Sequence, residues 1–214
     1  MRIVLFGDGD KDSRFYSWLL TEEIVGTTCG EVSRDRIAAL RPDIGLSIYY
    51  RHIFKPEIIS LFPQGIINLH TAYLPYNRGA YPNVWSIVDQ TPAGVTLHYI
   101  DEGIDTGPII AQEYVPVTAF DTGETLNNRL TDAAFELFKQ TWPKISDGTI
   151  KHGTYHNVAD VEKIDEIHLD ETYVARDLIN VLRARTYPPY DGAYFIDNGE
   201  KIYMELNLRK EDDE

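Results

Sequence analysis

The sequence is poor in cysteine, in long apolar runs and in basic residues. Its 214 residues include a single cysteine, Cys29, which excludes an intramolecular disulfide and a cysteine-based zinc site. No apolar run approaches the length of about 18 residues that a membrane-spanning helix needs. The N-terminal residues MRIVLFGDGD are typical of a first strand rather than of a signal peptide. We therefore expect a cytoplasmic protein that binds neither a membrane nor a metal ion.

The shortage of basic residues bears on the ligands. Lys and Arg number 20 against 34 Asp and Glu, which gives a formal net charge of −14. A surface this acidic repels phosphate backbones, so we expect no binding to nucleic acid. Any anionic ligand must then be bound by local arginines or by backbone N–H groups.

What is present is the composition of a globular α/β domain. Hydrophobic residues make up 43% and charged residues 25%, as in proteins with an ordinary core. Apolar runs alternate with segments of helical period, which predicts a doubly wound, mainly parallel sheet. We predict strands at Arg2–Phe6, Ile24–Cys29, Ile44–Tyr49, Gly65–Asn68, Val95–Ile100 and Pro108–Val115. We predict connecting helices near Ser13–Leu20, from Ser33 to Leu40, at Pro56–Leu61 and at Asn83–Val88.

The C-terminal third has a different pattern. Asp121 and Glu124 form an acidic variant of a capping box before a long amphipathic helix, which Pro143 is expected to end. A polar connector over Ser146–Thr172 precedes a further helix with Leu178 and Leu182 on its apolar face. A hairpin follows, with strands at Ala193–Ile196 and Lys201–Leu208 and a type I′ turn at Asn198-Gly199. We therefore divide the chain into a catalytic domain over residues 1–150 and a C-terminal helix and hairpin over residues 151–214.

Three polar residues in the central segment suggest chemistry. Asn68 and His70 lie two residues apart at the end of an apolar run, so in a strand they share one face. Asp105 lies between glycines in the loop after the fifth strand. Because ligands bind at the carboxyl ends of strands in open α/β sheets, both positions are expected at the site. An amide, an imidazole and a carboxylate together can stabilise an oxyanion and move a proton. Alone, however, each is more often a turn residue or a satisfied polar pair.

The remaining histidines have plainer interpretations. His98 lies in the middle of a predicted strand, and we interpret it as structural. His152, His156 and His168 fall in the polar connector without metal-ligand spacing. For His52 two interpretations stay open: a hydrogen bond within its loop, or a contact with a ligand.

The motifs around these residues resemble those of the folate-dependent formyltransferases. The resemblance rests on Asn68-x-His70, Leu74-Pro75-x-x-Arg78-Gly79, Gly94-Val95-Thr96 and Asp105-Thr106-Gly107. The stretches PYNRGAYPNVW, TPAGVTLHYIDEGIDTGPIIAQ and LRARTYPPYDGAYFIDNGEKIY are most similar to the nucleotide-sugar N-formyltransferases. This resemblance implies the Rossmann-like formyltransferase fold and transfer of a formyl group to an amino sugar carried on a nucleotide, often dTDP, for surface glycans.

The resemblance also implies a formyl donor and catalytic roles. The donor is N10-formyltetrahydrofolate, and no metal takes part. Asn68 and a protonated His70 would stabilise the oxyanion of a tetrahedral intermediate. Asp105 would keep His70 charged and help to move the proton from the attacking amine. In similar enzymes the pterin is held by loops that correspond here to Arg51, His52 and Ile53 and to Ile100, Asp101 and Ile104.

Substrate contacts follow from the same resemblance. Tyr76, Asn77, Arg78, Gly79 and Asn83 would face the amino sugar or its pyrophosphate, with Arg78 as the local cation. Tyr187 and Tyr190 are candidates to stack on the base, although they are equally well packing residues. The C-terminal hairpin is either a sheet extension or a dimer contact, and we expect a homodimer.

The sequence leaves several alternatives open. Glycinamide ribonucleotide formyltransferase is the nearest rival, whereas methionyl-tRNA formyltransferases add a β-barrel and formyl-folate hydrolases a regulatory domain that we do not expect here. A different class of answer is a non-catalytic subunit that binds folate or a nucleotide sugar. The stretch between the first and third strands also looks shorter than is usual in the family, which affects any ligand contact from that region.

Overall fold

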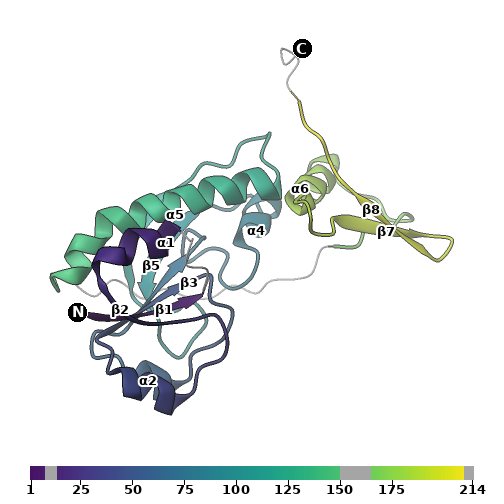
Figure 1. Cartoon of the computed structure of the whole chain (residues 1–214). Coiled ribbons are helices and arrows are strands. Elements are labelled where there is room, and N and C mark those ends of the chain that lie inside the picture. The colour runs from purple at the N-terminus through teal and green to yellow at the C-terminus, as the bar shows by residue number, and fades with distance from the viewer. Residues whose placement is uncertain (8–13, 150–164, 210–214) are drawn as a thin grey trace.

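The computed structural model describes residues 1–7, 14–149 and 165–209 of the chain. A six-stranded sheet forms the centre, with strand order β2-β1-β3-β4-β5-β6 (Figure 1). The strands are β1 (Arg2–Gly7), β2 (Glu23–Thr28), β3 (Ile44–Ile48), β4 (Ile66–His70), β5 (Gly94–Tyr99) and β6 (Ile109–Tyr114). The helices around them are α1 (Arg14–Trp18), the 3₁₀ helix η1 (Leu19–Thr21), α2 (Arg34–Leu40), α3 (Pro56–Ile59), α4 (Pro82–Val88) and α5 (Gly123–Ser146). The α/β prediction is confirmed.

The sheet changes direction at β5. The pairs β1–β2, β1–β3 and β3–β4 are parallel. By contrast, β5 is antiparallel to β4, and β6 is antiparallel to β5. The carboxyl end of β5 therefore lies at the edge of the sheet where β4 begins, and the Ile100 N–H donates to the Ile66 carbonyl there at 2.8 Å. The rule that ligands bind where parallel strands end therefore does not account for the position of Asp105, because β5 ends at the edge of the sheet opposite to His70. The loop after β5 has to fold back to bring Asp105 to the site.

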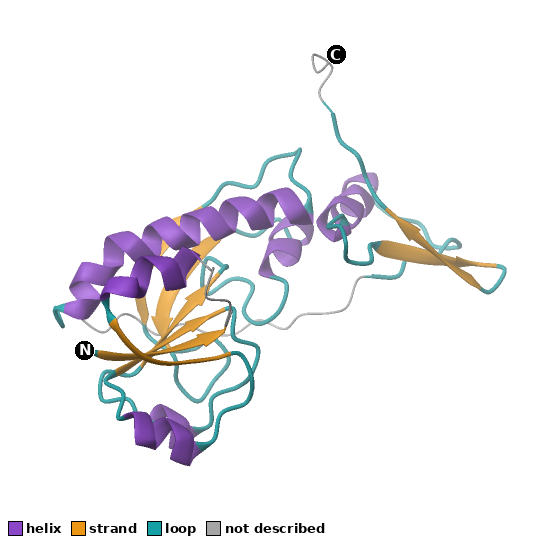
Figure 2. Cartoon of the chain, viewed as in Figure 1, coloured by secondary structure: helices purple, strands orange, loops and turns teal. Residues whose placement is uncertain are grey.

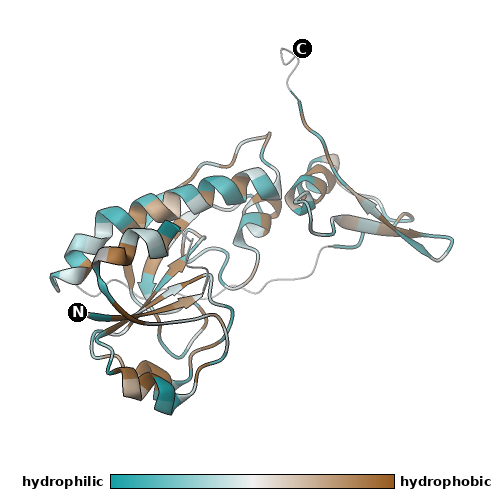
Figure 3. Cartoon of the chain, in the orientation of Figure 1, coloured by the Kyte–Doolittle hydropathy of each residue, from teal (hydrophilic) through white to brown (hydrophobic). Residues whose placement is uncertain are grey.

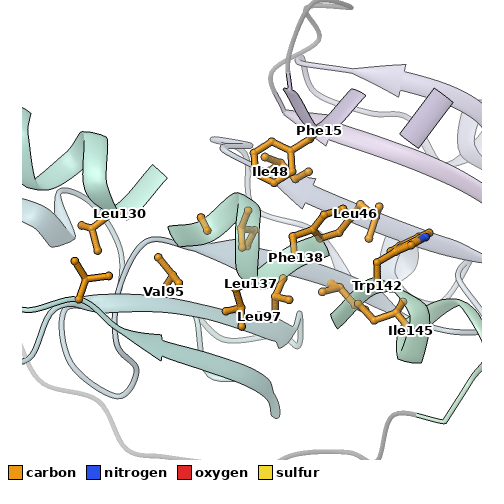
Figure 4. Packing of buried hydrophobic residues seen from close by; sticks show 14 of the residues in the cluster. Phe15, Leu46, Ile48, Val95, Leu97, Leu130, Leu137, Phe138, Trp142 and Ile145 are labelled. Atoms are coloured by element: carbon orange, nitrogen blue, oxygen red, sulfur yellow. The ribbon is translucent and has the colours of Figure 1, made fainter. Parts of the chain in front are cut away.

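Helices cover both faces of the sheet (Figure 2). On one face, α1 and α5 pack on β1, β3, β4 and β5 through the larger apolar cluster, in which Phe138 and Trp142 of α5 meet Phe15 and Leu46 (Figure 4). On the other face, Ile37 of α2 and Ile58 of α3 pack against Phe6. Burial of these apolar side chains is the main force that holds the layers together.

The ends of α5 differ from the expected ones. Thr122, not Asp121, is its N-cap: the Thr122 hydroxyl accepts the Thr125 N–H at 3.2 Å, and the Thr125 hydroxyl accepts the Thr122 N–H at 2.9 Å. The Asp121 carboxylate does not cap the helix, because it accepts the Thr118 N–H and an Arg129 N–H, both at 2.6 Å. Pro143 lies inside the last turn and does not end the helix, since Ile145 is buried beyond it.

The C-terminal part consists of α6 (Ala175–Arg185) and a hairpin of β7 (Ala193–Asp197) and β8 (Glu200–Met204). Helix α6 packs on α4 and α5, and the hairpin projects away from the sheet (Figure 1). The backbones meet so closely that a Cβ at Gly123 would lie 2.1 Å from the Ala184 carbonyl oxygen. The buried Arg183 fixes this contact, as its guanidinium donates to the carbonyls of Thr118 at 2.7 Å and Asp121 at 3.0 Å.

The C-terminal part differs from the sequence predictions in one strand end, and much of the predicted connector is not described. The second hairpin strand ends at Met204, earlier than the predicted Leu208. Most of the predicted connector, including His152 and His156, lies outside the described residues. Figure 3 shows apolar residues along the strands of the central sheet and on the helices that cover it. Within the described ranges no helix is long and apolar enough to cross a membrane.

Candidate active site

One face of β4 and β5 is polar where the other is apolar. Ile67 and Leu69 of β4 belong to the core beneath α5, so the alternation of the strand turns Asn68 and His70 to the opposite face. On β5 the same alternation places His98 on that face, directly opposite Asn68 in the antiparallel register. The His98 Nε2 lies 3.2 Å from Asn68 Nδ2, and the rings of His98 and His70 are 6.3 Å apart between centroids.

The loop after β5 carries Asp105 back onto this face. Gly107 allows the return, because a Cβ there would lie 1.8 Å from the Tyr99 carbonyl oxygen. Asp105 itself has a φ of 50°, in the left-handed region. Its Oδ1 lies 3.4 Å from Asn68 Nδ2 and 3.5 Å from His98 Nε2. Its Oδ2 lies 3.5 Å from His70 Nε2. The structure thus brings the three predicted catalytic residues together and adds His98.

The carboxylate is firmly ionised. Burial alone would raise the pKa of Asp105, but the hydrogen bond with His98, the charge of His70 and the Gly79 N–H lower this pKa to about 2. The Gly79 N–H donates to Asp105 Oδ2 at 2.8 Å. Asp105 is therefore a carboxylate near neutral pH.

The imidazole of His70 is neutral in the unliganded chain. Burial lowers the pKa of His70 below 6.5, and it outweighs the opposing effect of Asp105. The expectation that Asp105 keeps His70 protonated therefore does not hold for the free protein. The His70 Nε2–H donates to the Asn77 carbonyl at 3.3 Å, which leaves Nδ1 with a lone pair.

The segment between β4 and α4 forms one wall of the site and is anchored to the sheet. The Thr96 hydroxyl donates to the Ala72 carbonyl at 2.7 Å, and the Gln112 amide donates to the Leu74 carbonyl at 2.8 Å. Asn77 is held by its side chain, whose Nδ2 donates to the hydroxyls of Ser86 and Thr91, each at 2.8 Å. The expected substrate residues Asn77 and Gly79 thus position His70 and Asp105 through their backbones.

Arg78 was expected to face the amino sugar or its pyrophosphate as the local cation. Its side chain is buried, with 7% of the residue exposed. Burial lowers the pKa of Arg78, while the charges of Asp105 and Asp101 oppose that shift. The guanidinium therefore balances the acidic catalytic loop.

The other expected substrate residues fall in two groups. Asn83 is buried, and its amide donates to the Gly123 carbonyl at 2.9 Å, which joins α4 to α5. Tyr76 and Tyr190 are 43% and 64% exposed and free to contact a ligand. Tyr187 lies between these cases, since its hydroxyl accepts the Asn127 amide at 2.9 Å while its ring meets Tyr190 edge-on at 5.2 Å.

The expected folate residues lie on two loops. Arg51, His52 and Ile53 follow β3, whose carboxyl end adjoins that of β4, and Ile53 is 77% exposed. Ile100, Asp101 and Ile104 precede Asp105 on its own loop, with Ile104 60% exposed. The Asp101 carboxylate accepts the Gly103 N–H at 3.0 Å and so shapes that loop. Exposed aliphatic side chains on these loops are suited to a flat heterocycle.

Sequence reasoning missed two residues near the site. His98 was interpreted as structural, although strict alternation over Val95–Tyr99 places it on the polar face of β5. Arg185, at the end of α6, was not considered. Its guanidinium carbon lies 5.8 Å from the ring centroid of Tyr81, two positions after Gly79, and its Nε lies 3.0 Å from Asp165 Oδ1. No local pattern signals that α6 returns to this place.

Comparison with known proteins agrees with this geometry. A family model described as formyl transferase matches residues 30–141, more than half of the chain. The chain belongs to the formyltransferase family. A second model, described as the dimerization C-terminal domain of N-formyltransferases, matches residues 160–210 of this formyltransferase.

Individual relatives point in the same direction. The formyltransferase is 32% identical over 188 residues to the dTDP-4-amino-4,6-dideoxyglucose formyltransferase of Mycobacterium bovis, covering 83% of this chain and 79% of the relative. It superposes on a 4-N formyltransferase from Francisella tularensis with a TM-score of 0.80 and 27% identity, covering 98% of each chain. The formyltransferase PseJ from Anoxybacillus kamchatkensis, solved with UDP-4,6-dideoxy-4-formamido-L-AltNAc and tetrahydrofolate, is 38% identical with a TM-score of 0.65. That alignment covers 73% of this chain and 85% of PseJ.

Proposed function

We propose that this formyltransferase moves a formyl group from N10-formyltetrahydrofolate to the 4-amine of a dideoxy sugar carried on dTDP. The observation that carries this proposal is the cluster of Asn68, His70 and Asp105 within 3.5 Å contacts, on a chain of the formyltransferase family. The names of the M. bovis and A. kamchatkensis relatives both specify nitrogen at position 4 of the sugar. We favour dTDP over UDP because the dTDP relative aligns over the larger share of the chain.

The residues present fit a folate donor. The loops with Arg51–Ile53 and Ile100–Ile104 would hold the pterin, with exposed Ile53 and Ile104 offering apolar contact. When bound, the folate supplies the formyl group. The neighbouring PseJ structure, which contains tetrahydrofolate, supports this choice.

The chain's own groups handle charge and protons. An amine that adds to a formyl carbon places negative charge on the formyl oxygen, and the Asn68 amide is the neutral donor on the polar face. His70 begins neutral and can take a proton from the amine at Nδ1. Asp105 then stabilises the imidazolium, because its carboxylate lies 3.5 Å from His70 Nε2 and stays ionised. Collapse of the tetrahedral adduct would break the bond between the formyl carbon and N10, and the proton held on His70 would pass to N10 of the leaving tetrahydrofolate.

The nucleotide end is proposed to lie along α6. With Arg78 buried, Arg185 is the cation placed to bind the pyrophosphate, and Asp165 on one side and Tyr81 on the other fix its orientation. Tyr187 and Tyr190 follow Arg185 in the sequence, and their rings lie 5.2 Å apart. We propose that they stack on the nucleotide base.

The C-terminal hairpin is proposed as the dimer contact. An isolated two-stranded hairpin is marginally stable in water, yet this one leaves Ile196, Ile202 and Tyr203 between 39% and 50% exposed. Covering these side chains by a second copy would supply the missing apolar contact, in keeping with the dimerization domain that matches here. We further propose that the protein works in the cytoplasm and that its product serves a surface glycan.

A substrate panel tests the proposal. Purified protein is mixed with formyl-folate and, in separate reactions, with dTDP-linked and UDP-linked 4-amino sugars, a dTDP-linked 3-amino sugar and glycinamide ribonucleotide. Release of tetrahydrofolate is followed by absorbance and the product by mass. We expect turnover with the dTDP-linked 4-amino sugar, and a rate at least about 100-fold lower with the Asp105→Asn protein. Turnover with glycinamide ribonucleotide alone would show that the acceptor is wrong.

A further inference from the structure

We propose that Glu124 and Tyr187 recognise the edge of the nucleotide base and select uracil or thymine over cytosine. The Tyr187 hydroxyl would donate to a base carbonyl, and the Glu124 carboxylate would accept the base N3–H. The inference rests on the proposed nucleotide-sugar acceptor and goes beyond it, because it names the class of base and the two side chains that would select it.

The first turn of α5 lies against the chain that leaves α6. The Glu124 N–H donates to the Thr186 carbonyl at 3.3 Å, which places the residue before Tyr187 beside Glu124. Gly123 permits this close approach, because a Cβ there would lie 2.1 Å from the Ala184 carbonyl oxygen. Helices α5 and α6 are in contact with each other (Figure 1). The backbone therefore fixes where Tyr187 stands relative to α5.

Two polar side chains of α5 lie close to the Tyr187 hydroxyl. Glu124 and Asn127 are three positions apart and therefore share one face of the helix. Asn127 Nδ2 donates to the Tyr187 hydroxyl oxygen at 2.9 Å. Burial raises the pKa of Tyr187, and the nearby Tyr190 and Glu124 raise it further. The carboxylate of Glu124 is thus close enough to the phenol for its charge to act there.

These groups keep hydrogen-bonding capacity for a ligand. A phenol can both accept and donate, and the Asn127 amide uses only the acceptor side of the Tyr187 hydroxyl. Within residues 1–7, 14–149 and 165–209, no group accepts the hydroxyl hydrogen of Tyr187 and none donates to the Glu124 carboxylate. One donor and one acceptor therefore stand near each other at the junction of α5 and α6.

This pair complements the imide edge of uracil and thymine. In these bases an N3–H lies between two carbonyls, so the edge offers a donor next to an acceptor. In cytosine N3 carries a lone pair instead, which a carboxylate repels. Tyr190, 64% exposed, offers its ring for stacking beside this edge. Stacking tolerates any base, whereas the hydrogen bonds distinguish one base from another.

Nucleotide titrations by calorimetry, without folate, test the proposal. The ligands are dTDP, dUDP and dCDP; the last two share sugar and phosphates and differ only at the edge of the base. We expect the unaltered protein to bind dUDP at least about 10-fold more tightly than dCDP, as for one hydrogen bond to a charged group. Glu124→Gln should weaken dUDP binding by about 10-fold and reduce the preference over dCDP to about 3-fold or less, because an amide can donate to cytosine N3.

Two further variants complete the comparison. Tyr187→Phe keeps the ring and removes the donor, so it should weaken dTDP and dUDP binding by about 3- to 10-fold. Glu136→Gln is the matched control, since it makes the same change of charge further along α5, where Glu136 pairs with Lys139 at 2.9 Å. It should keep the preference for dUDP. Thermal melting checks that each variant is folded.

The sign of the change separates base recognition from net charge. Removing a carboxylate near a diphosphate would by itself tighten binding of all three nucleotides. Tighter binding of dUDP by Glu124→Gln would therefore overturn the proposal, and so would equal affinity of the unaltered protein for dUDP and dCDP. Neither result affects formyl transfer. Failure of the proposed function looks different: no nucleotide binds, and glycinamide ribonucleotide alone is turned over. If Tyr187→Phe fails to fold, Glu124→Gln decides.

Discussion

Asp105 Oδ2 accepts the backbone N–H of Gly79 at 2.8 Å, although the two residues lie 26 positions apart. This bond joins the loop that carries the Asp105 carboxylate to the segment that leads from β4 to α4. The same segment supplies the Asn77 carbonyl to His70. The groups to which we assign catalysis are therefore held by backbone contacts from a loop whose side chains were expected to bind substrate.

Replacing Asp105 by Asn should remove most activity while keeping the shape of the site. Asparagine can still accept the Gly79 N–H, but it cannot stabilise a positive charge on His70. We expect kcat to fall by about 100- to 10,000-fold, as for loss of a partner in proton transfer. Single-turnover formyl transfer measures this, with thermal melting as the control for folding. A folded variant with near-normal turnover would contradict the role given to Asp105.

His70 should make the stability of the protein depend on pH. Its folded-state pKa is lowered by burial, so between pH 6.5 and that lower value the unfolded chain binds a proton that the native chain does not. Stability is then lost as pH falls below 6.5, by at most about 1.4 kcal/mol at pH 5.5 for this one group. Urea unfolding at pH 7.5 and 5.5 should show a smaller drop for His70→Asn. An equal drop in both proteins would mean that His70 is not buried in its neutral form.

Arg185→Met should weaken binding of the nucleotide end. The change removes the cation proposed for the pyrophosphate but keeps a side chain of similar length over Tyr81. We expect KM for the nucleotide sugar to rise about 10-fold or more, while kcat and KM for folate stay within about 2-fold. Arg176→Met, an exposed arginine in the first turn of the same helix, is the control and should change neither constant. A rise in KM of equal size in both variants would point to net charge instead.

Ile202→Asp should dissociate the proposed dimer. A carboxylate in an apolar contact loses its hydration without a partner, which disfavours association. Sedimentation velocity should give a dimer for the unaltered protein and a monomer for the variant. Leu20→Asp places the same charge at a 63% exposed apolar position of η1 and should leave the dimer intact. A monomer in all three samples would exclude the hairpin as a dimer contact.

Local sequence patterns predicted most helices and strands, because burial of one face makes apolar residues recur at a regular spacing along the sequence. Apolar runs located all six strands of the central sheet, and the spacing of Leu126, Leu130 and Leu137 located α5. The direction of a strand has no such signal in the sequence, because the apolar pattern of β5 fits a parallel and an antiparallel strand equally well. The path of Asp105 depends on that direction, so its position was predicted through a resemblance and for a partly wrong geometric reason.

The site was predictable to the extent that it lies on strands. Asn68 and His70 follow from period-two alternation, and His98 could have followed from the same rule. The burial of Arg78 and the arrival of Arg185 depend on how distant segments pack, which no local pattern carries. The Asp121 carboxylate misled the capping prediction because it is bound by Arg129, eight positions later.

The way the C-terminal part is attached has a consequence for how the family can evolve. Arg185, Tyr187 and Tyr190 stand on the same short unit as the hairpin, and that unit meets the sheet domain mainly through α6 on α4 and α5. A recombination that exchanges this unit between relatives would carry the proposed nucleotide contacts and the proposed dimer contact together, while Asp105 stays with the recipient. We expect these two traits to diverge in step, so that enzymes able to form mixed dimers also share a nucleotide.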